Sequence, residues 1–146
     1  MAMDGTTLNM MVAEDNDDDI LMLREDVSGL GFVSLARVAR DGEECLEHLK
    51  ALDGSALPDL LLLDINMPKV NGFEVLRAVR GDPRLKNLSV VFLTVSTREE
   101  DMALALSLGA SAYISKPMDY EDFRSLVGTM LRFWHRVLPV AMRPAR

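Results

Sequence analysis

Short apolar segments alternate along the chain with longer segments in which apolar residues recur at helical spacing. The clearest apolar segment is Leu60–Leu63, four consecutive leucines that leave no polar face. Such a segment is typical of a strand that is buried on both sides of a parallel sheet. Pro58 and Pro68 limit it at either end. The pattern predicts strands over residues 8–13, 32–39, 59–63, 89–95 and 110–115.

Each predicted strand is followed by a segment with the apolar spacing of a helix. A helix over residues 17–31, for example, has the apolar positions Ile20, Leu23, Val27 and Leu30. Three further helices begin with a capping-box signature: Asp41 with Glu44, Asn71 with Glu74, and Thr97 with Glu100. A last helix is expected from about Asp119. Strand and helix alternate five times with short connections, which predicts a doubly wound α/β domain around a five-stranded parallel sheet.

Composition narrows the class of protein. The chain has 146 residues, of which 49% are hydrophobic, enough for one domain with its own core. A net charge of -7 argues against binding to nucleic acid or to an anionic membrane surface. The single cysteine, Cys45, excludes an internal disulfide and a cysteine metal cluster. No segment has the pattern of a signal peptide or the ~18 apolar residues of a membrane span, so we expect a cytoplasmic protein.

Four of the five predicted strands end at residues that can take part in chemistry. Glu14 and Asp15 follow the first strand, Asp64 follows the third, Thr94 lies near the end of the fourth, and Lys116 follows the fifth. Taken singly, each has an ordinary explanation, such as a helix cap for Asp15 or a solvated charge for Lys116. The carboxyl ends of the strands in a doubly wound sheet lie along one edge, however, so these side chains are expected to converge. We interpret them as one site.

The residue types indicate the chemistry of this site. Carboxylates close together repel one another unless a cation joins them. Oxygen ligands without histidine or cysteine favour a hard ion, most simply Mg²⁺. Such an ion keeps Asp64 ionised as a nucleophile toward phosphorus, while Thr94 and Lys116 supply a neutral donor and a cation for the phosphoryl oxygens. The predicted product is an acyl phosphate on Asp64.

The same segments resemble the receiver domain of two-component response regulators. The resemblance lies in the E-D pair at Glu14, the D-I-N-M-P-K-V-N-G segment from Asp64, the T-V-S-T segment from Thr94 and the S-K-P segment around Lys116. It covers about residues 8–130 in the order and spacing of the family. It implies a CheY-like fold with strand order 2-1-3-4-5.

The resemblance implies a phosphorylation site with a metal ion. Asp64 would be the phosphoacceptor. Asp15 and Asp64 would bind Mg²⁺ directly, Asn66 would contribute its backbone carbonyl, and Glu14 would act largely through water. Position 14 carries glutamate where many members of the family have aspartate.

The resemblance also implies a conformational switch. Thr94 would be the switch hydroxyl, Tyr113 the aromatic residue that turns inward with it, and Lys116 the partner of the phosphoryl group. In the family the peptide bond before Pro117 is usually cis. A receiver domain assists its own phosphorylation and dephosphorylation but is not otherwise an enzyme.

Domain organisation and partners follow from the same resemblance. We expect a receiver domain over residues 8–138, preceded by a loose N-terminus, 1–7, and followed by a flexible tail, 139–146. The expected partners are a sensor histidine kinase and a downstream protein, because no output domain fits in the remaining residues.

Val95 departs from the pattern of the family, in which the residue after the switch hydroxyl is usually small. Valine is bulky and its first torsion is restricted. It either completes the strand or narrows access to Asp64, which would slow transfer or loss of phosphate. We favour the second interpretation.

The last helix extends past the end of a minimal receiver domain. Adjacent Phe133 and Trp134 point about 100° apart on a helix, so both cannot face the same core. Either one lies flat on the surface or the region contacts another protein, most simply a second copy in a symmetric dimer. We favour the dimer, with the candidate interface residues Phe133, Trp134, Val137 and Leu138. The F-W-x-x-V-L-P ending and E-D-N-D opening are similar to single-domain regulators paired with phytochrome-type sensor kinases.

Three other functions compete with this interpretation. A haloacid-dehalogenase-like phosphatase also uses a strand-end aspartate and Mg²⁺, but it needs a second aspartate where this chain has Asn66. A scaffold that no longer needs phosphate is disfavoured because every key position is filled. A flavodoxin-like cofactor domain is disfavoured because the first loop is acidic where a flavin phosphate needs donors.

Overall fold

The structure is a computed structural model that describes residues 7–138. The predicted loose N-terminus, apart from Thr7, and the predicted tail 139–146 lie outside the described residues.

Five parallel strands form one sheet in the order β2-β1-β3-β4-β5, which confirms the predicted doubly wound fold. β5 begins two residues later than predicted, and β4 ends before Val95. The strands are β1 Leu8–Ala13, β2 Val33–Ala39, β3 Leu60–Leu63, β4 Ser89–Thr94 and β5 Ala112–Ser115.

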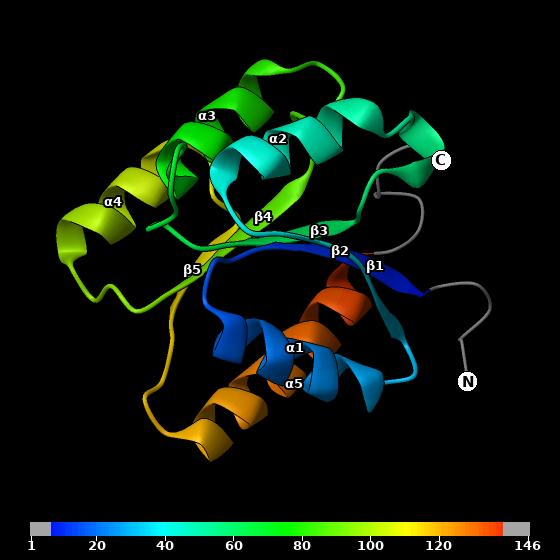
Figure 1. Ribbon diagram of the computed structural model, residues 1–146, viewed down its shortest axis with the longest axis vertical. Helices are drawn as coiled ribbons and strands as arrows, with labels where there is room; N and C mark the ends of the chain where they lie inside the picture. The colour runs from blue at the N-terminus through cyan, green and yellow to red at the C-terminus, as the bar shows by residue number, and fades with distance from the viewer. Residues whose placement is uncertain (1–6, 139–146) are drawn as a thin grey trace.

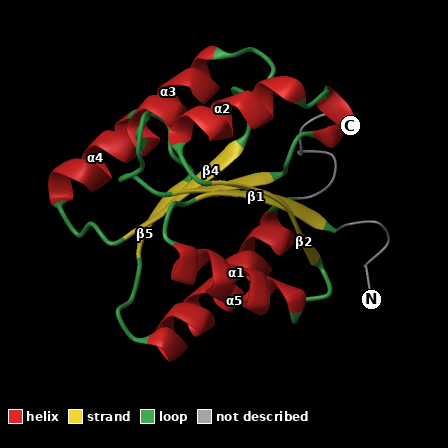
Figure 2. Ribbon diagram, in the orientation of Figure 1, coloured by secondary structure: helices red, strands yellow, loops and turns green. Residues whose placement is uncertain are grey.

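Helices cover both faces of the sheet. Figure 1 shows α1 and α5 on one face and α2, α3 and α4 on the other, and Figure 2 shows the sheet as the middle of three layers. Within residues 7–138, no helix has the length and apolar character needed to span a membrane. The helices are α1 Asp17–Ser28, α2 Gly42–Ala51, α3 Gly72–Gly81, α4 Glu99–Ser107 and α5 Tyr120–Val137, with a 3-10 turn at Gly54–Ala56.

The four leucines of β3 pack into two separate cores, one on each face of the sheet. Leu61 and Leu63 belong to the core under α2, α3 and α4, whereas Leu60 and Leu62 belong to the core under α1 and α5. All four are buried, as the sequence predicts. β3 pairs with β1 so that Leu63 lies opposite Ala13, and this register determines where the following residue, Asp64, emerges.

Side-chain caps begin most of the helices. Asp41 accepts from the Glu44 amide, and Asn71 and Glu74 form the complete predicted capping box. The prediction for α4 is wrong, because this helix starts at Glu99 after Arg98, with no side-chain cap. The preceding loop bonds to Ser96 instead: Ser96 Oγ accepts from the Arg98 amide and donates to Asp101 Oδ2 over 2.6 Å.

The bond between Lys116 and Pro117 is trans, since the structure contains no cis peptide bond within the described residues. The cis isomer that the resemblance implies is therefore not found. Trans is the intrinsically favoured isomer of such a bond.

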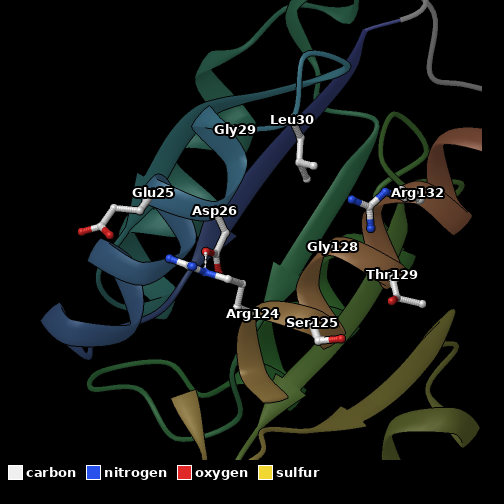
Figure 3. Close-up of a pocket in the computed structure, with 9 residues that line it drawn as sticks. All are labelled: Glu25, Asp26, Gly29, Leu30, Arg124, Ser125, Gly128, Thr129 and Arg132. Carbon is white, nitrogen blue, oxygen red and sulfur yellow. Dashed lines mark hydrogen bonds and ion pairs between the residues drawn. The ribbon is translucent and has the colours of Figure 1, made fainter. Parts of the chain in front are cut away.

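An ion pair joins the two helices on the α1 side of the sheet. Arg124 Nε of α5 donates to Asp26 Oδ1 of α1 over 3.0 Å, and the other oxygen of this buried carboxylate has no hydrogen-bond partner in the described part of the chain. Figure 3 shows this pair on the wall of a cavity of about 380 Å³ between the helices.

Candidate functional site

The strand ends bring the predicted site residues together. β1 and β3 are neighbours in register, with Ala13 opposite Leu63, so Glu14 and Asp64 emerge side by side. β4 and β5 are likewise in register, with Thr94 opposite Ser115, which places Lys116 next to the end of β4. The carboxyl ends of the strands therefore lie along one edge of the sheet, as the predicted topology requires.

Asp64 is held by the backbone around it. Its amide donates to the Ala13 carbonyl over 3.1 Å, and its Oδ1 accepts from the Ile65 amide over 2.7 Å. Gly72 closes the following loop, because its amide donates to the Ile65 carbonyl. A Cβ at position 72 would lie 2.3 Å from the Asp64 carbonyl oxygen, so only glycine fits this approach.

Three carboxylates are close enough to share a metal ion. One oxygen each from Glu14, Asp15 and Asp64 lies within 4.8 Å of the others. Glu14 and Asp64 are buried, whereas Asp15 is exposed and leaves the group open to solvent. Oxygen donors without nitrogen or sulfur fit a hard divalent cation such as Mg²⁺ or Mn²⁺. Asn66, the fourth predicted ligand, is exposed two residues after Asp64.

Lys116 is the cation of the site. Its Nζ lies 2.5 Å from Glu14 Oε1, 2.8 Å from Asp19 Oδ2 and 3.6 Å from Asp64 Oδ2. Its side chain is only 6% exposed. The alternative of a solvated surface charge is therefore wrong for Lys116.

Burial and the neighbouring charges shift the pKa values of Glu14 and Lys116 in opposite directions. Burial raises the pKa of Glu14 to about 7, although the hydrogen bond and positive charge of Lys116 lower it. Burial alone would lower the pKa of Lys116, but hydrogen bonds to Asp19 and Glu14 outweigh it and raise that pKa. Lys116 thus stays positively charged, whereas Glu14 changes charge near neutral pH.

Thr94 and Tyr113 lie on neighbouring strands and contact the same loop. Thr94 is fully buried, and its Oγ1 accepts from the Ser96 amide over 3.4 Å. The Tyr113 hydroxyl and Ser115 Oγ both donate to the Ser96 carbonyl, over 3.0 Å and 3.1 Å. The two predicted switch residues are therefore linked through Ser96.

Val95 lies at the rim of the site. β4 ends at Thr94, so Val95 does not complete the strand, and it is 68% exposed. It lines a cavity of about 610 Å³ together with Asp19, Lys116 and Met118.

Asp19 is the site residue that the sequence did not single out. It lies in the first turn of α1, four residues after Asp15, and its carboxylate contacts Lys116. The sequence signal that could have identified it is an acidic residue in the first helical turn directly after the strand-end pair Glu14 and Asp15, although Asp17 and Asp18 carry the same signal.

The predicted interface residues divide between surface and core. Phe133 and Val137 are exposed, Trp134 is half-buried, and Phe133 and Trp134 meet edge to face with ring centroids 5.5 Å apart. Leu138 is buried in the core beside α1 and is not available to a partner.

The chain is similar to known regulators over most of its length. The response regulator receiver domain family matches residues 10–128. A probable methanogenesis regulatory protein, FilR2 of Methanothrix harundinacea, is 33% identical over 127 residues, which are 86% of this chain and 82% of that protein. Response regulator Rcp1 of Synechocystis is 31% identical over 118 residues, which are 81% of this chain and 71% of Rcp1.

Two solved structures have the same fold. A crystal structure of the Mn²⁺-bound form of Rcp1 has a TM-score of 0.84 and 29% identity, and the match covers 94% of this chain and 99% of that one. The phosphorylated cyanobacterial phytochrome response regulator RcpA has a TM-score of 0.80 and 31% identity over 88% of this chain and 94% of that one. The chain therefore belongs to the family of response regulator receiver domains, the signalling domains of two-component systems.

Proposed function

We propose that the chain is a single-domain response regulator that accepts a phosphoryl group on Asp64 from a sensor histidine kinase. It then signals by binding a partner or by passing the phosphoryl group on. The observation that carries this proposal is the position of the Asp64 carboxylate, which lies within 4.8 Å of oxygens of Glu14 and Asp15 and 3.6 Å from Lys116 Nζ. The family membership and the phosphorylated relative RcpA support it.

The transfer itself is a substitution at phosphorus. An oxygen of Asp64 attacks the phosphorus atom while the bond from phosphorus to the donor breaks, and the donor keeps that electron pair. The Thr94 hydroxyl and the Lys116 ammonium donate to the phosphoryl oxygens. Once Thr94 is so engaged, its contact with the Ser96 amide and the Tyr113 bond to Ser96 can rearrange, which alters the surface around α4.

Mg²⁺ is the ion that we propose for the acidic group. Asp15, Asp64 and the Asn66 backbone carbonyl would hold it directly and Glu14 through water, as the family resemblance implies. When bound, the ion offsets the negative charge of the carboxylates and of the incoming phosphoryl group. The close arrangement of Glu14, Asp15 and Asp64 and the Mn²⁺-bound form of Rcp1 support this assignment.

The direct test is to incubate the chain with Mg²⁺ and acetyl phosphate and to analyse it by mass spectrometry. We expect an acid-stable, base-labile adduct of about 80 Da, the mass of one phosphoryl group. Asp64→Asn should abolish the adduct, whereas Asp59→Asn, at a buried aspartate on the other end of β3, should retain it in any variant that folds.

The competing functions give different results in this test. Turnover of phosphate esters without an adduct would favour the phosphatase. Neither adduct nor turnover, in a chain that binds a partner, would favour the scaffold.

We also propose that the chain forms a symmetric dimer through the exposed side of α5. Phe133 and Val137 are exposed there beside Trp134, around a cavity of about 570 Å³ with a mainly apolar lining. Light scattering coupled to gel filtration should give a dimer mass for the chain and a monomer mass for Phe133→Ser. Leu21→Ser, at an exposed leucine on α1, is the matched control that should remain dimeric. A monomeric wild-type chain would contradict the dimer.

The kinase partner is proposed to be of the phytochrome type. Support comes from the similarity to RcpA, a cyanobacterial phytochrome response regulator. We further propose that the chain acts in the cytoplasm and signals to a downstream protein.

A further inference from the structure

Asp19 binds Lys116, the cation that we also propose to bind the phosphoryl group. Its Oδ2 lies 2.8 Å from Lys116 Nζ, closer than the 3.6 Å that separates Nζ from Asp64 Oδ2. The Lys116 side chain is 6% exposed, so water cannot readily replace a lost partner. In this structure, therefore, Lys116 is bound to Asp19 and Glu14 and is out of hydrogen-bond reach of Asp64.

The start of helix α1 fixes the backbone of Asp19. The Asp19 amide donates to Asn16 Oδ1 over 2.9 Å, the capping bond that begins α1. Asp19 also lines the cavity that contains Lys116 and Val95. The backbone of Asp19 is therefore held by the cap of α1, and its side chain lines the same cavity as Lys116.

The Asp19 carboxylate and a phosphoryl oxygen would repel each other if both were bound to Lys116. A phosphoryl oxygen that binds Nζ lies within about 6 Å of the Asp19 carboxylate, since both are hydrogen-bonded to the same nitrogen. At this distance, beside a partly buried carboxylate, two negative charges repel each other appreciably. Glu14 belongs to the acidic group that we propose to hold Mg²⁺, whereas Asp19 is not part of that group.

We propose that Asp19 is a positioning residue that competes with the phosphoryl group for Lys116 and thereby restrains phosphorylation of Asp64. This inference rests on the proposed function. It predicts that removal of the Asp19 charge speeds formation of the acyl phosphate and stabilises the phosphorylated form.

The experiment compares Asp19→Asn with Asp18→Asn. Asparagine keeps the shape of the side chain, and Asp18 is an exposed neighbour whose substitution changes the net charge equally. Two quantities are measured in the presence of Mg²⁺: the rate of adduct formation with acetyl phosphate, and the affinity for beryllofluoride, a phosphoryl analogue that needs no reaction. For Asp19→Asn we expect both to increase about three- to tenfold, because an ion pair of a partly exposed carboxylate is lost.

Lys116→Met tests whether Asp19 acts through Lys116. In that background Asp19→Asn should change neither quantity, because the shared cation is gone. The proposal is overturned if Asp19→Asn behaves like Asp18→Asn, if it slows adduct formation or weakens beryllofluoride binding, or if its effect persists without Lys116. The first comparison decides the matter even if Lys116→Met does not fold. Failure of the proposed function would look different, because the wild-type chain itself would then form no adduct.

Discussion

Lys116 Nζ donates a hydrogen bond to Glu14 Oε1 over 2.5 Å and so joins residues 102 positions apart in the chain. The two residues follow β5 and β1, and the ends of β3 and β4 lie between those strands in the sheet. The lysine side chain therefore reaches across the site rather than along its border. The pKa of Glu14 consequently depends on Lys116, and the pKa of Lys116 depends on Glu14 and Asp19.

The affinity for Mg²⁺ should rise with pH around neutrality. Burial raises the pKa of Glu14 to about 7, and a protonated Glu14 cannot offer a negative charge to a metal site. Between about pH 6 and pH 8 we expect an increase of up to about tenfold in affinity, measured by isothermal titration calorimetry. Glu14→Gln should flatten this dependence, whereas Glu47→Gln, at an exposed position of α2, should not.

Glu14 should have the opposite pH dependence in the stability of the metal-free chain: its contribution falls as the pH rises. The pKa of Glu14 in the folded chain lies above its ordinary value of 4.5, so the folded state binds the proton more tightly. The contribution of Glu14 to the free energy of unfolding therefore falls as the pH rises from about 4.5 to about 7. A metal affinity that is independent of pH, or a free energy of unfolding that rises in this window because of Glu14, would contradict the assignment.

Substitution of Gly72 should damage both stability and phosphorylation. In Gly72→Ala the new Cβ would meet the Asp64 carbonyl oxygen at 2.3 Å and the Phe92 ring at 2.9 Å. We expect the free energy of unfolding to fall by about 1–3 kcal/mol, measured by urea denaturation, together with slower adduct formation on Asp64.

Gly81→Ala is the matched control for this prediction. Gly81 ends the same helix, and a Cβ there would have no neighbour within 4 Å among the described residues. Alanine should leave phosphorylation unchanged and raise the free energy of unfolding, by at most about 1 kcal/mol. Equal effects of the two substitutions would show that the contact with Asp64 is unimportant.

Tyr113 and Ser115 should stabilise the Ser96 loop in a coupled way. Each donates to the Ser96 carbonyl, so Tyr113→Phe or Ser115→Ala alone leaves this oxygen one donor. We expect each to lower the free energy of unfolding by about 0.5–1.5 kcal/mol, and the double substitution to cost more than their sum. Strict additivity in urea denaturation would mean that the two bonds act independently.

Val95→Ala should speed phosphorylation by small phosphodonors such as acetyl phosphate. Val95 is 68% exposed at the rim of the cavity that contains Lys116, so a smaller side chain widens the approach. The free energy of unfolding should change by no more than about 0.5 kcal/mol, as for other exposed substitutions. Equal rates of adduct formation in the two chains would rule out a role in access.

Arg124→Met should weaken the contact between α1 and α5. The side chain of Asp26 is 4% exposed, and one of its oxygens already lacks a hydrogen-bond partner within the described residues (Figure 3). Loss of Arg124 removes the donor to the other oxygen, so the free energy of unfolding should fall. Asp26→Asn in the same chain should recover part of the loss, because it removes the buried charge. Arg132→Met, on the same helix, should have a smaller effect than Arg124→Met.

Much of the fold follows from local pattern and chain topology. Leu60–Leu63 has no polar face, so burial of β3 on both sides needs no knowledge of its neighbours. The parallel arrangement then brings Glu14, Asp64 and Lys116 to one edge whatever their separation in sequence.

The parts that sequence reasoning missed depend on geometry within short segments. Asp17, Asp18 and Asp19 are adjacent acids, and only the rotation of α1 decides that Asp19 meets Lys116 while Asp17 pairs with Arg40. Thr97 and Glu100 have the spacing of a capping box, but the bonds of Ser96 fix the loop, and α4 starts later. Leu138 looked like a surface residue because the bend at the end of α5 is not visible in the sequence.

The division of the β3 leucines between two cores has a consequence for hydrogen exchange. Amide protons of Leu61 and Leu62 are protected by helical layers on both faces and by strands on both edges. They should exchange with solvent only when the whole domain unfolds, whereas those of the loop at Ser96 should exchange through local opening. The aspartate that we propose to be phosphorylated is thus attached to the slowest-exchanging part of the chain, while the segment that responds to it can open independently.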